Sequence, residues 1–367
     1  MKETLFFGGK DYFEALIKAI DQAKTSILLE AYIFNSDEIG ELVIQALLRA
    51  AARKVKVKVL IDGLGSCDSA NRIIEVLSPS CRVRIYHPLP WKLRHFLYAY
   101  PSLLLHSFFN INIRNHRKLV IIDQKLLFTG SFNITKEHVD DVNCIGWRDT
   151  GICLDSFDLT ELNQACNSAW KNINYTETIR SFFKAVKNNL CVRINNTWYR
   201  RRILHRDLLN KIKRAKGRIW ITNAYFVPDS ALLKQLIAAA KRGVDVKILL
   251  PSRSDIAFMP WTSQTFYRKL LIVNTKIFEY LPAILHAKTL IIDDWMTIGS
   301  SNLNHRSLLH DLELDIVVQT DKAKEMLVTQ FKKDIENAKT VQIEDLNKRT
   351  WYQKLVGEFL LHLRYLM

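Results

Sequence analysis

The sequence predicts an α/β protein made of two tandem copies of one α/β/α unit, each with a mostly parallel sheet between helices. Two observations lead to this prediction. A strand, a helix and a second strand occur in the same order in both halves, and each half then continues to a segment that contains a His-x-Lys triplet. Because strands alternating with helices form β-α-β units, the 367 residues are expected to fold as two similar domains.

The three elements of the first copy can be identified from their patterns. Residues 23–34 (AKTSILLEAYIF) contain the apolar run of a buried strand, and residues 39–54 have apolar side chains at helical spacing. Residues 55–63 (VKVKVLIDG) alternate apolar and polar side chains, as a half-buried strand does. The same order returns in residues 215–228, 230–243 and 244–252, which indicates a duplication.

The duplication divides the chain into residues 1–174 and 175–350, with the boundary expected after the helix that contains Trp170. A C-terminal segment, residues 351–367, has apolar residues at helical spacing with charged residues between them. It reads either as an amphipathic membrane anchor or as a helix docked on the domain. The first copy also carries an apolar insertion at residues 96–109, which is either a membrane-facing wall or a buried helix.

The repeated segments share one arrangement of polar residues. Each has a histidine, a lysine two residues later and an aspartate five residues after that, followed by Gly-Ser-x-Asn. Side chains two apart on a strand face the same way, so each histidine is expected to lie beside its lysine. The residues concerned are His116, Lys118, Asp123 and Asn133 in the first copy, and His286, Lys288, Asp293 and Asn302 in the second.

The paired H-x-K-x4-D motifs resemble the signature of the phospholipase D superfamily, and the resemblance covers nearly the whole chain. It implies that the two phospholipase D-like units meet at a pseudo-twofold axis, where His116 and His286 converge on one phosphodiester. One histidine is then expected to form a phosphohistidine while the other protonates the leaving alcohol and later activates the acceptor. An imidazole suits both tasks because it is nucleophilic and titrates near neutrality.

The remaining motif residues have expected roles in this scheme. Lys118 and Lys288 neutralise the non-bridging oxygens, and Asn133 and Asn302 donate hydrogen bonds to them. Acid, base, nucleophile and charge neutralisation are all supplied by side chains, so neither a metal nor a cofactor is expected. The nearby serines are expected to be turn residues, because no G-x-S-x-G elbow surrounds them.

Carboxylates are also needed, because each histidine requires a partner that fixes its tautomer. Asp149 and Glu313 follow the motifs at similar offsets and are the candidates. Asp123 and Asp293 are instead expected to hold the motifs' own architecture. Five residues separate Asp293 from Gly299, whereas the first copy and the family pattern have six. The orientation of the Asn302 side chain is therefore in question. The other eight histidines, His138 among them, are expected to be structural or solvent-exposed.

The composition indicates a polyanionic partner. Lysine and arginine outnumber aspartate and glutamate by 53 to 37, for a formal net charge of +16. An anionic membrane surface and a nucleic acid both fit this charge, and the densest basic run, residues 200–218, fits a nucleic-acid backbone. That run has aromatic residues only at Trp198 and Tyr199 beside it, which gives little support to base stacking.

Finer resemblance favours lipid. The runs LLEAYIF, VKVLIDG and GWRDTG look like those of short bacterial cardiolipin synthases. This resemblance implies a phosphatidyltransferase that uses anionic phospholipids and works as a peripheral protein on the cytosolic face of the inner membrane. The alternatives are a phospholipase D hydrolase and a phosphodiesterase nuclease, and a nucleic acid is the expected partner only for the latter.

The cysteines and the hydropathy agree with a cytoplasmic, membrane-peripheral location. The six cysteines form no C-x-x-C pair and no zinc spacing, and they are expected to be buried, reduced thiols. The N-terminal residues lack the apolar core of a secretory signal, and no apolar stretch reaches the length of a spanning helix.

Overall fold

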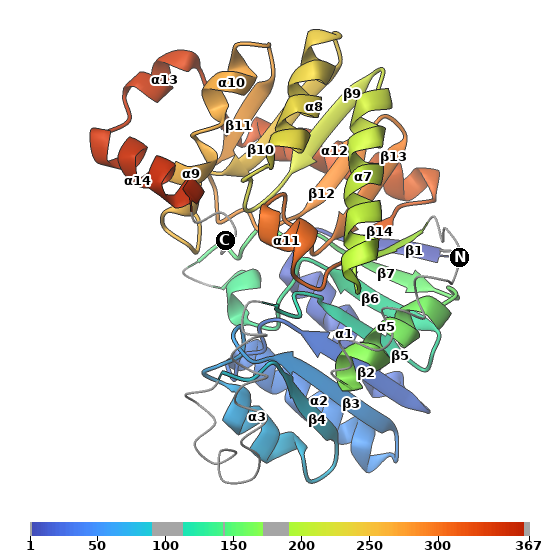
Figure 1. Ribbon diagram of the computed structural model, residues 1–367. Coiled ribbons are helices and arrows are strands. Elements are labelled where there is room, and N and C mark those ends of the chain that lie inside the picture. Colours follow the sequence, from blue (N-terminus) through green and yellow to red (C-terminus); the bar gives the residue numbers. More distant parts are fainter. Residues whose placement is uncertain (1, 90–112, 142–143, 172–190, 363–367) are drawn as a thin grey trace.

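The computed structural model describes residues 2–89, 113–141, 144–171 and 191–362, which form two sheet-centred halves (Figure 1). In the first half, seven strands lie in the order β1-β7-β6-β5-β2-β3-β4. Their bounds are β1 Lys2–Phe6, β2 Ser26–Ala31, β3 Lys56–Asp62, β4 Arg82–Tyr86, β5 Leu119–Ile122, β6 Leu126–Gly130 and β7 Gly151–Asp155.

The second half repeats this order with one added edge strand, as β15-β11-β10-β9-β12-β13-β14-β8. The strands are β8 Val192–Ile194, β9 Arg218–Thr222, β10 Asp245–Pro251, β11 Lys276–Tyr280, β12 Thr289–Ile292, β13 Trp295–Gly299, β14 Leu314–Val317 and β15 Ala338–Thr340. Strand by strand, the seven positions of the first sheet correspond to β8, β14, β13, β12, β9, β10 and β11. The two tandem α/β units predicted from the sequence are therefore confirmed.

Helices cover both sheets, and a third core joins them. Apolar side chains of α1, α2 and α3 pack on one face of the first sheet, and those of α7, α8 and α10 pack on one face of the second. The remaining face of each sheet contributes to a common core with α5 and α12. The bounds are α1 Gly9–Gln22, α2 Glu38–Ala52, α3 Ala70–Leu77, α5 Thr160–Lys171, α7 Trp198–Arg214, α8 Ser230–Lys241, α10 Tyr267–Leu271 and α12 Asp321–Glu336.

The expectation of mostly parallel sheets was wrong. Within the two sheets of the described residues, parallel pairing is confined to β2-β3-β4 and β9-β10-β11, the strands linked by crossover helices. The motif strands instead form the hairpins β5-β6 and β12-β13, and strands joined by so short a turn must run antiparallel. Both sheets are consequently mixed.

The halves are joined by two reciprocal backbone contacts. Asn115, just before the first motif histidine, forms a bridge with Leu312, and Leu285, just before the second, forms a bridge with Arg148. Leu312 and Arg148 directly precede the candidate carboxylates Glu313 and Asp149. Equivalent residues of each half thus contact equivalent residues of the other, as a twofold relation between the units requires.

The shorter spacing in the second motif is absorbed by its hairpin turn. Three residues, from Asp123, connect β5 to β6, whereas two, from Asp293, connect β12 to β13. Both aspartates have φ of 51°, a left-handed conformation that aspartate tolerates in tight turns. After the hairpins, Ser131 N–H donates to Thr150 O and Ser300 N–H donates to Leu314 O, both at 3.0 Å, so the two Gly-Ser-x-Asn segments make equivalent backbone contacts despite the shorter spacing.

Several expectations fall near the limits of the described residues. The boundary at 174/175 and the apolar insertion at 96–109 lie outside them. The C-terminal segment does form a helix, α14 (Trp351–His362), which packs against α9 (Met259–Ser263). No disulfide joins the six cysteines, all of which lie in the described residues, but only Cys81 and Cys166 are buried. Within the residues that the structure describes, no helix has the length and apolarity needed to cross a membrane.

Candidate active site

The site lies where the two halves meet, and the backbone contacts between them place both motif histidines there. The backbone N–H of His116 donates to Leu312 O at 2.9 Å, and that of His286 donates to Arg148 O at 2.9 Å. Each histidine is therefore fixed directly beside the segment of the opposite half that carries a candidate carboxylate, just before β14 or β7.

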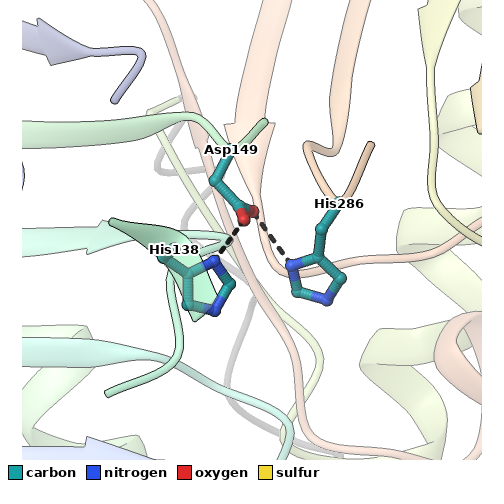
Figure 2. Close-up of side chains that lie close together, drawn as sticks. All are labelled: His138, Asp149 and His286. Carbon is teal, nitrogen blue, oxygen red and sulfur yellow. Dashed lines mark hydrogen bonds and ion pairs between the residues drawn. The ribbon is translucent and has the colours of Figure 1, made fainter. Parts of the chain in front are cut away.

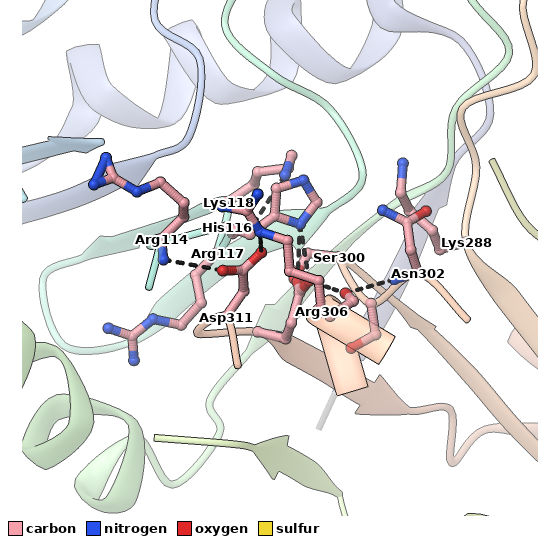
Figure 3. Close-up of polar contacts among 12 residues, drawn as sticks. Arg114, His116, Arg117, Lys118, Lys288, Ser300, Asn302, Arg306 and Asp311 are labelled. Atoms are coloured by element: carbon pink, nitrogen blue, oxygen red, sulfur yellow. Dashed lines mark hydrogen bonds and ion pairs between the residues drawn. The ribbon is translucent and has the colours of Figure 1, made fainter. Parts of the chain in front are cut away.

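Each histidine pairs with the carboxylate of the other half. His116 Nδ1 lies 2.9 Å from Glu313 Oε1, and His286 Nδ1 lies 2.9 Å from Asp149 Oδ1 (Figure 2). Figure 3 shows His116 beside Lys118 in this site. All four side chains are buried. A carboxylate that accepts from Nδ1–H leaves the Nε2 lone pair free to attack phosphorus or to take a proton.

Two glycines allow the carboxylate strands to come this close. A Cβ at Gly130, whose φ is 141°, would lie 2.4 Å from Thr150 O, and one at Gly299 would lie 2.5 Å from Leu314 O. Thr150 and Leu314 directly follow Asp149 and Glu313, so a side chain at either glycine would push a carboxylate away from its histidine.

Both lysines lie within the same buried site. Lys118 Nζ donates to His116 O at 2.8 Å, and Lys288 Nζ donates to His286 O. Each lysine thus lies beside its own histidine, as the His-x-Lys spacing predicted. Lys288 acts electrostatically on both His116 and Lys118, although it belongs to the other motif. The two motifs therefore face one site with two cations.

The asparagines present unpaired polar atoms. Among the described residues, Asn133 Oδ1 and Asn302 Oδ1 are buried and have no hydrogen-bond partner. The O and N of a carboxamide can exchange places by rotation, so each side chain can offer either an acceptor or a donor here. Buried polar atoms without partners favour a polar ligand, which agrees with the phosphate-binding role expected of both residues.

Asp123 and Asp293 lie at the opposite ends of the motif strands. Asp123 accepts from the backbone N–H groups of residues 24–26 at 2.7–3.0 Å, and Asp293 accepts from those of residues 216–218 at 2.8–2.9 Å. These contacts attach each motif hairpin to the start of a central strand, β2 or β9. The structure therefore supports an architectural role for both aspartates.

The electrostatic setting keeps both histidines neutral near pH 7. Burial lowers the pKa of His286 to about 4, and Lys288 acts in the same direction. Burial likewise lowers the pKa of His116, together with Lys118 and Lys288. Both imidazoles are therefore available as nucleophile or base, and a bound anion will favour their protonated forms.

The two carboxylates differ from each other. Burial raises the pKa of Glu313 to about 7, although Lys118 opposes this. Burial acts on Asp149 in the same direction, but its two histidine neighbours hold its pKa well below the usual range. Asp149 is thus firmly ionised, whereas Glu313 titrates near neutrality.

Comparison with known proteins agrees with this geometry. The family model described as "Cardiolipin synthase, PLD-like domain" matches residues 16–144 and 208–335, one match in each half. The chain is also 31% identical to a cardiolipin synthase of Clostridium perfringens over 98% of its own length and 75% of that protein.

The chain belongs to the phospholipase D-like cardiolipin synthase family.

Other relatives extend the match. Cardiolipin synthase B of Escherichia coli K12 is 31% identical, with 96% of this chain and 84% of that protein covered. A solved phosphatidylserine synthase of Haemophilus influenzae shares the fold with a TM-score of 0.67 at 14% identity, over 99% of this chain and 94% of that one.

Two members of the site had no role in the expectations drawn from the sequence. His138 is fully buried and its Nδ1 lies 2.6 Å from Asp149 Oδ2, so it shares this carboxylate with His286. The ring of Tyr32 lies 4.7 Å from that of His116, with Lys118 Nζ 5.2 Å from its centre. The repeated Ala-Tyr at the ends of β2 and β9 was the available signal for Tyr32.

Metal-type donors occur together at one place among the described residues. Ligand atoms of His138, Asp149 and His286 lie within 4.8 Å of one another. Figure 2 shows both Nδ1 atoms directed at the carboxylate oxygens, at hydrogen-bonding distances of 2.6 and 2.9 Å. We therefore interpret the three residues as a hydrogen-bonded chain.

The lysines predict an alkaline loss of activity. Burial lowers the pKa of Lys118 to about 7 and that of Lys288 to about 8. Only the ammonium form neutralises a phosphate, so kcat/KM is expected to fall as the pH rises through this range. Bound substrate favours the charged form, so the corresponding fall in kcat should lie at higher pH. Both profiles can be measured between about pH 5 and pH 10.

Alanine at either lysine should lower kcat/KM by about 10²-fold or more, as the loss of one preorganised cation does. Lys118→Arg should move the alkaline fall of its residual activity upward, toward the pKa of Lys288 at about 8, because a guanidinium keeps its charge. An alkaline fall only near pH 10, where exposed lysines titrate at about 10.4, would contradict the lowered pKa of both lysines.

Proposed function

We propose that this chain transfers a phosphatidyl group from one glycerophospholipid to the hydroxyl of another through a phosphohistidine, which gives a cardiolipin-type product. The observation that carries the proposal is the pair of reciprocal histidine–carboxylate contacts, which gives one site two imidazoles with free Nε2 atoms. The relatives named cardiolipin synthase, which match nearly the whole chain, support the lipid substrate.

In the first step, one of His116 and His286 attacks phosphorus through Nε2. A P–N bond forms, and the P–O bond to the leaving alcohol breaks. The other histidine, protonated once the anionic diester is bound, gives its proton to the leaving oxygen. Lys118 and Lys288 stabilise the charge on the non-bridging oxygens.

In the second step, the histidine that gave up its proton acts as a base. It takes the proton from the hydroxyl of a second lipid, whose oxygen attacks phosphorus and breaks the P–N bond. The nucleophilic histidine is released unchanged. Water in place of the lipid would give phosphatidic acid, so transfer depends on holding the acceptor near the phosphohistidine.

The product pattern tests the proposal. Purified protein is incubated with phosphatidylglycerol or mixed phospholipid vesicles, and separately with single-stranded and duplex DNA. Mass spectrometry is expected to show a cardiolipin-type lipid, with phosphatidic acid as a minor product. DNA cleavage without any lipid product would overturn the proposal in favour of a nuclease.

The basic run on α7, which was the feature favouring a nuclease, is partly used inside the molecule. Arg201 is buried, and Arg200 forms an ion pair with Glu161 of α5 in the other half. These two cations are therefore not available on the surface of α7 to follow a nucleic-acid backbone.

Removal of metal is expected to leave the activity largely unchanged. Two imidazoles, two ammonium groups and two amides supply nucleophile, acid, base and charge neutralisation, so each step above runs on side chains alone. Dialysis against a chelator, followed by the product assay, tests this. A rate lost to chelator and restored only by zinc or magnesium would require a different mechanism.

Membrane attachment through α14 completes the proposal. Trp351, Leu355 and Phe359 are 76%, 61% and 63% exposed, although α14 packs against α9 (Figure 1). The side chain of Lys348, just before the helix, is 78% exposed. An exposed apolar face beside a cation suits the interface of an anionic membrane, which we place at the cytosolic leaflet of the inner membrane.

Serine at both Trp351 and Phe359 should weaken binding to anionic vesicles by about tenfold or more, since these rings would no longer be buried among lipids. The matched control is Leu42→Ser, because Leu42 is 53% exposed but lies on α2 in the other half. Vesicle flotation measures both. Equal flotation of the double variant and wild type would remove α14 as the anchor.

A further inference from the structure

The Asp149 carboxylate accepts from two histidines, only one of which belongs to an H-x-K motif. His286 Nδ1 lies 2.9 Å from Oδ1, and His138 Nδ1 lies 2.6 Å from Oδ2 (Figure 2). The His138 ring is enclosed by the rings of Phe132 and Trp147, at 5.7 and 5.2 Å. His138 thus shares with the motif histidine His286 the carboxylate that holds His286 in place.

The protonation state of His138 is fixed by its other nitrogen. The backbone N–H of Asn133 donates to His138 Nε2 at 3.2 Å. A backbone N–H cannot accept, so Nε2 must carry the lone pair and Nδ1 the proton that is donated to Asp149. The two contacts together therefore select the Nδ1–H tautomer of His138.

The second half contains the same chain of contacts with serine in place of this histidine. The backbone N–H of Asn302 donates to Ser307 Oγ at 2.9 Å, and Ser307 Oγ donates to Glu313, the partner of His116. His138 and Ser307 each lie five residues after the asparagine. The recurrence in both halves shows that the link between asparagine and carboxylate is part of the architecture.

The two chains are not equally supported. Glu313 also accepts from Ser300 Oγ, whereas the hydroxyl of Ser131, the equivalent residue, donates to Thr150 O at 3.2 Å. Among the described side chains, His138 is therefore the one donor that shares Asp149 with His286. Without His138, Asp149 keeps only His286 of these side chains as a donor, whereas without Ser307, Glu313 still accepts from Ser300 and pairs with His116. Removal of His138 should therefore disturb its carboxylate more than removal of Ser307 does.

We propose that His138 is a positioning residue of the reaction, which ties the phosphate-binding turn at Asn133 to the carboxylate that orients His286 of the other half. This inference rests on the proposed phosphohistidine chemistry, but not on the lipid as substrate. His138 holds Asp149 in place and ionised, and Asp149 in turn holds His286 with Nε2 toward the phosphorus.

The charges around Asp149 determine the expected pH effect. Besides the two imidazoles, its carboxylate interacts with cations of both motifs and with a phenol of the second half. These groups are His138, His286, Lys118, Lys288 and Tyr225. Burial raises the pKa of Asp149 and His138 lowers it, so removing His138 should raise this pKa. The acidic fall in activity should accordingly move to higher pH.

Three variants test the proposal with bis(p-nitrophenyl) phosphate as the substrate. His138→Phe removes both hydrogen bonds and should lower kcat by about tenfold to hundredfold, as expected for a lost hydrogen bond to a charged group. His138→Gln restores a donor and an acceptor without a titrating group and should recover most of the activity. Ser307→Ala, the matched change in the other half, should cost less than His138→Phe.

A structural readout separates this inference from the proposed function. Long-range ¹H–¹⁵N NMR of histidine-labelled protein should show His286 as a single Nδ1–H tautomer in wild type and as a tautomer mixture in His138→Phe. An unchanged His286 tautomer, or a loss that His138→Gln does not restore, would overturn the inference. Absence of a cardiolipin-type product from wild type would instead overturn the proposed function and leave the tautomer result standing.

Discussion

Alanine at His116 or at His286 abolishes turnover, with an expected loss of about 10⁴-fold or more in kcat, as when one member of a catalytic unit is removed. In the proposed mechanism each imidazole performs a task on the same phosphorus, and both are buried with their Nδ1 atoms paired to carboxylates. The lysines beside them cannot substitute, because their ammonium groups are needed for charge neutralisation. The measurement is initial velocity with bis(p-nitrophenyl) phosphate.

The same two variants reveal which histidine is the nucleophile. A p-nitrophenolate leaves without a proton, so a variant that keeps the nucleophile should release about one equivalent of nitrophenol and then stall as the phosphohistidine. The variant without the nucleophile should release none. His362→Ala, an exposed histidine on α14, is the control. Steady turnover by either single variant would disprove the two-histidine mechanism.

Asp149→Asn should lower kcat by about 10³- to 10⁴-fold, in line with the loss seen when the carboxylate of a serine-protease triad becomes an amide. His138 and His286 both donate to this carboxylate, and a carboxamide offers only one acceptor. One imidazole must then face a donor and change its tautomer. His286 is the residue expected to lose its free Nε2 lone pair.

Glu313→Gln should cost about tenfold less than Asp149→Asn. The partners of Glu313 besides His116 are the hydroxyls of Ser300 and Ser307, which can rotate to accept from an amide. Comparison of kcat for the two variants at one pH, with unfolding temperatures to verify the fold, gives the result. Equal losses would show that the hydroxyl groups do not adapt.

The sequence allowed the polar residues of the site to be predicted, because the duplication makes each motif a check on the other. Asp149 and Glu313 were identified from their offsets. The pairing of each carboxylate with the histidine of the other half was not predictable, because an offset along the chain does not say which half a side chain faces. The pairing across the halves depends on the bridges at residues 115 and 285, whose partners, Leu312 and Arg148, are more than 130 residues away along the chain.

His138 was expected to be structural or solvent-exposed, and its place in the site was missed for a related reason. Its spacing from Asn133 matches that of Ser307 from Asn302, but the two residues differ in type and no motif includes them. Their equivalence depends on the hydrogen bonds that each makes to a backbone N–H and a carboxylate. The parallel sheets were mispredicted because apolar runs alone do not distinguish a crossover strand from one arm of a hairpin.

The exchanged carboxylates also limit how the enzyme can move. Further polar contacts cross between the halves, with Arg148 bound to Asp334 at 2.8 Å and the Arg114 backbone N–H bound to Asp311 at 3.0 Å. If the halves swung apart to admit a lipid, both histidines would lose their tautomer partners in the same motion. Separation of the halves would therefore dismantle the site, so we expect the two halves to stay together while substrates bind and products leave.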